Sequence, residues 1–317
     1  MRRIWVTGLI GVSTLALAGC GSVVAQAPHS TPKGPWATVG KTTITRAQVT
    51  ERAHVLGLFQ PSLPVKSVTS KSNLQVALDQ MVQGDLLMAK THPKVNSAAE
   101  QAYVGQVMSS LGSAYPGTNG VTAREKALGI TNGQVTRFLK GEYTLEAAAQ
   151  TYVGTMPASY AKNYYETHKA SFKLTTEEVN VRHILVKTQA EAKSILNQIE
   201  HGASFTKLAE KDSLDRSSAI HGGNLGWFGP GVMVPPFNKA AFSTPVGHYA
   251  IVHSQFGWHV LQVLGREKAG TIPPFSQVEQ QAVSDATQAY DSAQIQKALA
   301  KLQKEIRVKF HGVGKNA

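Results

Sequence analysis

Cysteine is almost absent from this sequence, which has a single one at Cys20. One cysteine cannot form a disulfide within the chain or the cysteine-rich site that holds structural zinc. Histidine does not replace it, because His248, His253 and His259 lack the i, i+4 spacing of helical ligands and have no acidic ligand set nearby. The sequence therefore predicts no metal site, and it indicates no cofactor.

Acidic residues are also scarce, since 20 Asp and Glu stand against 32 Lys and Arg, for a formal net charge of +12. The charge is +10 once Arg2 and Arg3 leave with an export signal (12 − 2). Such a surface is attracted to anionic polymers of a cell envelope or to lipid headgroups. A solvated basic surface without a partner is an equally good interpretation. Nucleic acid is disfavoured, because the Lys and Arg residues are scattered and an export signal precedes them.

The apolar run Ile4–Ala18 is shorter than the roughly 20 residues of a transmembrane helix. It follows Met1-Arg-Arg, as in an export signal. It ends in Leu17-Ala-Gly-Cys20, which resembles the lipobox of bacterial lipoproteins, whose cysteine is acylated and becomes the new N-terminus. We expect a signal peptide over residues 1–19, a lipid anchor at Cys20 and a location on the extracytoplasmic face of the cell membrane. An incidental cysteine behind a conventional signal is the alternative.

Helical patterns dominate residues 36–175, after a linker over residues 20–35 that is rich in Pro and Gly. A short hairpin turning at Gly40-Lys41 is expected first. Helices should then begin at candidate capping boxes, with Gly129 as a stop signal. These boxes are Thr45-x-x-Gln48, Ser97-x-x-Glu100, Thr122-x-x-Glu125 and Thr131-x-x-Gln134. Nothing in this region has the spacing of a catalytic site.

A further long helix is predicted within residues 268–317, beyond the boundary at Pro273-Pro274. Ser276-x-x-Glu279 is its candidate start. The positions expected to be buried are Val278, Ala282, Val283, Ala286, Ala293, Leu299 and Leu302. Periodicity alone leaves open whether this helix packs on the N-terminal helical region or stands by itself.

The most specific motifs lie between residues 179 and 264. They are Val179-Asn-Val-Arg-His-Ile-Leu-Val186, Gly222-Gly-Asn-Leu-Gly-Trp-Phe-Gly229, Met233-Val-Pro-Pro-Phe237 and Phe256-Gly-Trp-His-Val260. In this order they resemble a parvulin-type peptidyl-prolyl cis/trans isomerase domain, here over residues 176–267. The resemblance implies an α+β fold, with a small antiparallel sheet flanked by helices. It also implies that this domain is inserted in a mainly helical domain, as in the extracytoplasmic foldases of the PrsA and SurA kinds.

Strand alternation places His183 on the face of Val179 and Val181, and His259 on the face of Leu261 and Val263. The resemblance implies that the two histidines lie together at the floor of the active site. A purely structural role beneath the site is an equally good interpretation, since rotation about an amide requires no general acid or base. The resemblance also implies that apolar side chains form the proline pocket and bind substrate. These are Leu225, Met233, Phe237 and Phe256.

One position departs from the resemblance. The family has a cysteine or an aspartate just before the double glycine, and an ungapped count from Gly222 reaches Arg216 rather than Asp215. Either a one-residue bulge returns Asp215 to the site as a catalytic residue, or Arg216 faces the substrate. Phosphoserine-directed relatives carry a basic cluster after the first strand, whereas this chain has only Lys187 there.

The resemblance therefore implies an isomerase and chaperone that assists the folding of secreted proteins with X-Pro bonds. The alternative is a non-catalytic holdase that uses the parvulin domain to bind peptides. The sequence leaves a homodimer open.

Overall fold

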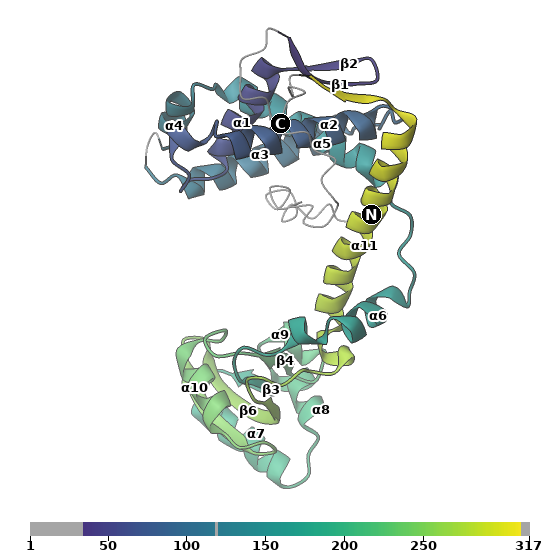
Figure 1. Cartoon of the computed structure of the whole chain (residues 1–317). Helices are drawn as coiled ribbons and strands as arrows, with labels where there is room; N and C mark the ends of the chain where they lie inside the picture. The colour runs from purple at the N-terminus through teal and green to yellow at the C-terminus, as the bar shows by residue number, and fades with distance from the viewer. Residues whose placement is uncertain (1–33, 118–119, 312–317) are drawn as a thin grey trace. The chain divides into compact units, whose positions relative to one another are not determined.

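The computed structural model describes residues 34–117 and 120–311 of the chain (Figure 1). The expected signal peptide, Cys20 and most of the expected linker lie outside the described residues. Contacts divide the chain into two compact units. The first runs to Thr155 and resumes at Ala289, and the second is continuous from Met156 to Gln288. None of the helices in the described part of the chain has the length and apolar character that a membrane span requires.

The first unit contains a three-stranded antiparallel sheet in the order β2-β1-β7. Its strands are β1 (Pro35–Val39), β2 (Thr42–Thr45) and β7 (Val308–Phe310). The predicted hairpin is confirmed, and Gly40 takes a φ of +57°, which a side chain would strain. The inner face of the sheet packs on the core through Ala37, Val39 and Ile44.

Six helices lie wholly within the described part of this unit. They are α1 (Arg46–Leu58), η3 (Val65–Ser67), α2 (Lys71–Met88), α3 (Ser97–Ala114), α4 (Gly120–Leu128) and α5 (Asn132–Gln150). One core joins α1 and α2 to the sheet and to Leu299 and Leu302 near the C-terminus. A second core joins the far end of α1 to α3, α4 and α5, with Leu58, Val107 and Val135 buried. Residues from both ends of the chain therefore complete this unit.

Of the four capping boxes predicted for this unit, two are confirmed and two are wrong. Thr45 and Thr131 each form a capping box with the Gln three residues later, and Gly129 follows the end of α4. Ser97 is not a cap, because the side chain of Asn96 accepts from the backbone N–H of Ala99 and starts α3 one residue earlier. Thr122 is not a cap either, because α4 has already begun at Gly120.

The second unit is built on a four-stranded antiparallel sheet in the order β4-β3-β6-β5 (Figure 1). The strands are β3 (Glu178–Val186), β4 (Asn224–Phe228), β5 (Tyr249–Ser254) and β6 (Gly257–Glu267). The helices that connect these strands are α7 (Gln189–Glu200), α8 (Phe205–Asp212), α9 (Arg216–Ala219) and α10 (Pro235–Ser243). Alternation along β3 and β6 gives the sheet two apolar faces. One packs on α7 and α8 through Ile184 and Val260, and the other on α10 through Val181 and Leu261.

The long C-terminal helix, α11 (Phe275–Glu305), supplies residues to both units. It begins at Phe275, so Ser276 lies inside it rather than at its cap. Its first turns pack with α6 (Tyr160–Thr167) and η4 (Lys169–Phe172), where Tyr165 donates a hydrogen bond to the carbonyl of Pro273. Ala282, Ala286, Leu299 and Leu302 are buried as predicted, but Val283 is 40% exposed, which corrects that prediction. Val283 lies one position past Ala282 and so turns away from the same contact.

Candidate functional site

Two histidines meet on the α10 face of the second sheet. His183 of β3 and His259 of β6 are both buried, and their Nδ1 atoms lie 3.0 Å apart. His183 is paired across the ladder with Leu261, so the two histidines are diagonal neighbours on one face. The sequence predicts this face for both, and the structure brings them together.

A chain of hydrogen bonds runs through both rings. The backbone N–H of Phe256 donates to Ser254 Oγ at 3.1 Å, and Ser254 Oγ lies 2.7 Å from His259 Nε2. At the other end His183 Nε2 lies 2.9 Å from Asp215 Oδ2. We infer the proton positions from Asp215, because an ionised carboxylate only accepts. His183 then donates from Nε2 and accepts at Nδ1 from His259, and Ser254 donates to His259, so every ring nitrogen is satisfied.

Asp215, not Arg216, faces the histidines. Asp215 is the N-cap of the four-residue helix α9, and its carboxylate accepts from the Ser217 and Ser218 hydroxyls at 2.5 and 2.7 Å. Arg216 is exposed and donates to the carbonyl of Glu210 at 3.2 Å. The backbone N–H of Leu214 donates to Leu185 at 2.7 Å, which fixes the segment before α9 against the end of β3.

The electrostatics of this group favour neutral rings beside an ionised carboxylate. Burial opposes ionisation of Asp215, but hydrogen bonds from Ser217, Ser218 and His183 outweigh it and hold the pKa of the carboxyl well below its usual range. Burial lowers the pKa of His183 against the opposing effect of Asp215. Burial, with His183 and His253 nearby, lowers the pKa of His259 to about 4. The contact between His183 and Asp215 is therefore a hydrogen bond from a neutral imidazole at pH 7, not an ion pair.

One apolar ring lies directly beside the histidines. The Phe237 ring meets both imidazoles edge-on, with centroids 5.5 Å from His183 and 5.1 Å from His259. Phe237 is buried, whereas Leu225 and Met233 are partly buried against the same cluster. Because the two remain partly exposed, they can contact a small apolar ring. Phe256 differs, since its backbone joins the hydrogen-bond chain while its side chain is 59% exposed.

Three serines that hydrogen-bond to this group are not identified by the sequence motifs. Ser254, Ser217 and Ser218 are common residue types, and only their contacts with His259 and Asp215 distinguish them. One signal was present for Ser254, which is a small polar residue in an apolar strand immediately before the turn that leads to His259. The two serines after Asp215 carry the Asp-x-Ser-Ser pattern of a helix cap, which is too common to indicate a site.

Residues 165–267 match the family model described as the PPIC-type PPIASE domain. Nearly the whole chain is similar to the foldase protein PrsA of Clostridium tetani, at 26% identity over 96% of this chain and 94% of that protein. The chain is a PrsA-like protein with a parvulin-type isomerase domain. The chaperone SurA of Pseudomonas aeruginosa is 40% identical over 38% of this chain, which spans only 30% of SurA.

The parvulin NmPin of Nitrosopumilus maritimus is 41% identical over 28% of this chain and 98% of its own, with a TM-score of 0.27.

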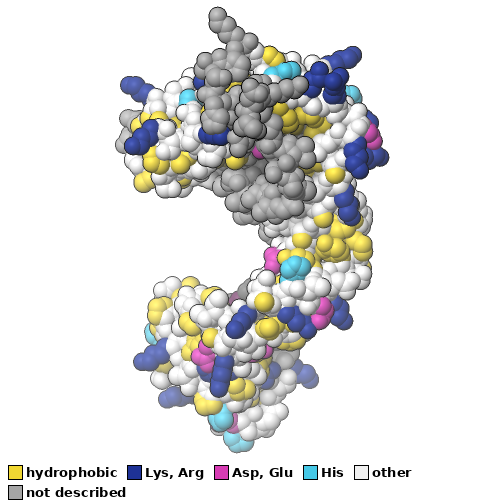
Figure 2. Space-filling model, in the orientation of Figure 1, with side chains coloured by type: hydrophobic (Ala, Val, Ile, Leu, Met, Phe, Trp, Pro, Cys, Tyr) yellow, Lys and Arg dark blue, Asp and Glu magenta, His cyan; other side chains and the backbone are white. Residues whose placement is uncertain are grey.

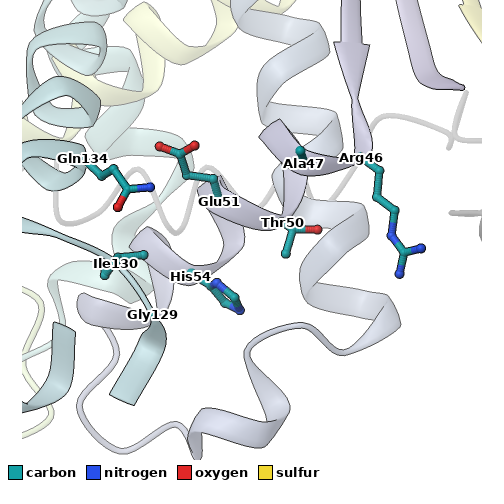
Figure 3. Close-up of a pocket in the computed structure, with 8 residues that line it drawn as sticks. All are labelled: Arg46, Ala47, Thr50, Glu51, His54, Gly129, Ile130 and Gln134. Atoms are coloured by element: carbon teal, nitrogen blue, oxygen red, sulfur yellow. The ribbon is translucent and has the colours of Figure 1, made fainter. Parts of the chain in front are cut away.

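The helical unit of this PrsA-like chain has a hollow of its own, of about 520 Å³ (Figure 3). Five of its lining residues belong to α1 and three to the segment from the end of α4 to the start of α5. Its titratable side chains are Arg46, Glu51 and His54. Among the described residues this hollow has no histidine–carboxylate hydrogen bond comparable to that of His183 and Asp215. The parvulin domain therefore remains the candidate active site.

Proposed function

We propose that this protein catalyses cis/trans isomerisation of X-Pro bonds in unfolded proteins outside the cytoplasm and acts on them as a chaperone. The observation that carries the proposal is the continuous hydrogen-bond chain from Ser254 through His259 and His183 to Asp215, set beside Phe237. Of the three residues that the sequence predicts to be catalytic, we propose that Asp215 acts on the substrate and that His183 and His259 position Asp215. Leu225, Met233, Phe237 and Phe256 are proposed to bind the substrate.

The chemistry needed is rotation about an amide, whose barrier is about 18–20 kcal/mol. Rotation ends the delocalisation of the nitrogen lone pair into the carbonyl, so the oxygen becomes less negative and the carbonyl carbon more electron-poor. A fixed carboxylate beside the amide stabilises that charge distribution more than the planar one. Asp215 is suited to this task, because its hydrogen bonds keep it ionised and hold it in place.

The apolar side chains supply the second requirement. A proline ring held against Phe237, Leu225 and Met233 would fix one side of the bond while the preceding carbonyl turns. The neutral His183 and His259 would then act as positioning groups for Asp215. They are not proton donors to the substrate, because both of their protons are already engaged within the hydrogen-bond chain.

The holdase interpretation is not favoured. The holdase would be favoured if Arg216 occupied the position of the family's acidic residue. Arg216 is instead exposed, and its guanidinium donates a hydrogen bond to the backbone carbonyl of Glu210.

The test is isomerisation of X-Pro tetrapeptides by the chain lacking residues 1–20, compared with His183→Ala and Met233→Ala. We expect clear acceleration by the parent chain, and a loss of at least about tenfold in kcat/KM in each variant, since each removes a buried or substrate-facing group. No acceleration by the parent, with aggregation of an unfolded client still suppressed, would overturn the enzyme and leave a chaperone.

We further propose that the chain is anchored through acylated Cys20 on the extracytoplasmic side of the cell membrane. The lipobox resemblance supports this anchor, and mass spectrometry of the mature N-terminus tests it. Binding to anionic envelope polymers and a homodimer stay predictions from the sequence. The domain limits at residues 36, 176 and 268 also stay predictions.

A further inference from the structure

The three-stranded sheet of the first unit carries an uncompensated positive charge. Residues 34–50, which form β1, β2 and the start of α1, contain Lys41 and Arg46 and no Asp or Glu. Residues 306–311, which include β7, contain Arg307 and Lys309 and again no acidic residue. All four cationic side chains are exposed, and none of the ion pairs found within the described residues involves them.

These cations gather on one part of the unit. Lys309 lies opposite Thr38, and Thr38 lies opposite Thr43, in the row that alternates with the buried Ala37 and Val39. Lys309 therefore projects from the face turned away from the core. The backbone N–H of Gly40 donates to the carbonyl of Arg307 at 2.9 Å, so Arg307 lies beside the turn that carries Lys41. Figure 2 shows Lys and Arg side chains gathered at this edge of the unit.

We propose that this basic sheet face, defined by Lys41, Arg307 and Lys309, binds the anionic headgroups of a membrane surface. Protein interfaces are centred on large apolar or aromatic anchors, whereas the outward-facing row here is Thr43, the half-buried Thr38 and Lys309. Phosphate-bearing headgroups need only cations and hydroxyls. Each cation near such a surface strengthens binding by about fivefold, and salt weakens the effect.

The position of the face in the chain favours a membrane over other anionic partners. Fourteen residues separate Cys20 from Pro35, the first residue of β1. Fully extended, they reach at most about 50 Å. In a chain anchored at Cys20, this sheet is thus the first described structure beyond the anchor. This step rests on the proposed anchor, but the charge of the face does not.

The experiment measures binding of the chain from residue 21 onward, which has no acyl group, to two kinds of vesicle. One contains phosphatidylglycerol mixed with phosphatidylcholine, and the other phosphatidylcholine alone. The test variant replaces Lys41, Arg307 and Lys309 by Gln. Arg46 is kept, because its guanidinium lies over the Trp36 ring. The matched control replaces three exposed lysines of the second unit by Gln, which changes the net charge equally; these are Lys193, Lys207 and Lys239.

We expect the parent to bind the anionic vesicles only, the test variant to bind about 100-fold more weakly, and the control to bind nearly as well as the parent. Equal losses in both variants would overturn the proposal, since net charge would then suffice. Absence of parent binding would overturn it too, as would binding to soluble polyphosphate without binding to vesicles. If the triple variant unfolds by circular dichroism, Lys41→Gln and Lys309→Gln alone should each weaken binding about fivefold. Peptide isomerisation, followed in parallel, tests the proposed enzyme separately.

Discussion

Asp215 sets the direction of the whole hydrogen-bond chain, because it is the member whose side chain cannot donate at neutral pH. Asp215→Asn would place an amide next to Ser218 and His183, which both point a proton at the present carboxylate. We expect kcat/KM for X-Pro peptides to fall by about 10- to 100-fold, as for loss of a hydrogen bond to a charged group. Arg216→Ala is the matched control, and its activity should stay within twofold of the parent. Equal losses of kcat/KM in the two variants would contradict this assignment and indicate that Arg216 contributes to the site.

The burial of His259 predicts a dependence of stability on pH. Its pKa is lowered to about 4 in the folded chain, whereas in the unfolded chain it titrates near 6.5. Protonation therefore favours the unfolded state. The contribution of His259 is fully present above pH 6.5 and is lost as the pH falls towards 4, by on the order of 3 kcal/mol.

Urea unfolding of the second unit, followed by tryptophan fluorescence over this pH range, measures the effect. His259→Gln should flatten the slope, and an unchanged slope would show that His259 is not held neutral.

The sequence motifs assign His183, His259 and the apolar residues to the candidate site, because each lies in a motif whose strand or turn can be recognised. It does not decide between Asp215 and Arg216. That choice depends on α9, whose four residues are too few for a periodic pattern.

At the scale of elements, the turn into β4 brings its backbone close to the site. A Cβ atom on Gly223 would lie 2.1 Å from the carbonyl oxygen of His183, and Gly223 has a φ of +79°. His183 in turn donates its backbone N–H to Gly223 at 2.8 Å. Only glycine allows this approach between the turn and the strand that carries the site histidine.

Gly223→Ala should lower the free energy of unfolding by more than about 3 kcal/mol and abolish isomerisation, because both the clash and the backbone strain act. Gly226→Ala is the control. Gly226 has a similar φ of +73°, but a Cβ atom there would have open space, so only the strain of about 1 kcal/mol remains. Urea titration of both variants measures the difference. Similar losses would show that the approach to His183 costs little.

Helix and strand identities follow well from the sequence, whereas starts that depend on competing caps do not. Asn96 precedes Ser97, and both are good N-caps. The pattern Ser97-x-x-Glu100 therefore places the N-cap of α3 one residue too late in the sequence. The helix α4 shows the limit of the pattern more clearly, since Thr122 fits a capping box but lies within the first turn of a helix that has already begun.

At the scale of the molecule, α11 links the two units covalently, but its ends serve different cores. Leu299 and Leu302 are buried in the first unit, whereas the isomerase domain is complete within the second. Leu299→Ala should destabilise the first unit by about 2–5 kcal/mol. It should leave peptide kcat/KM within twofold.

The measurement pairs thermal unfolding with the peptide assay, and Leu299→Met is the control that keeps the volume. A parallel loss of activity would mean that the site depends on the first core.

The pairing of β1 with β7 also sets an order of events. The first and last strands of the described chain are neighbours, so the first unit cannot be completed until residues 308–310 have been released from a ribosome or a translocation channel. The isomerase domain is continuous in sequence and needs none of those residues. The isomerase domain of a newly made molecule can thus fold before the helical unit does. A product truncated before β7 would keep a folded isomerase domain but would lack a complete first unit.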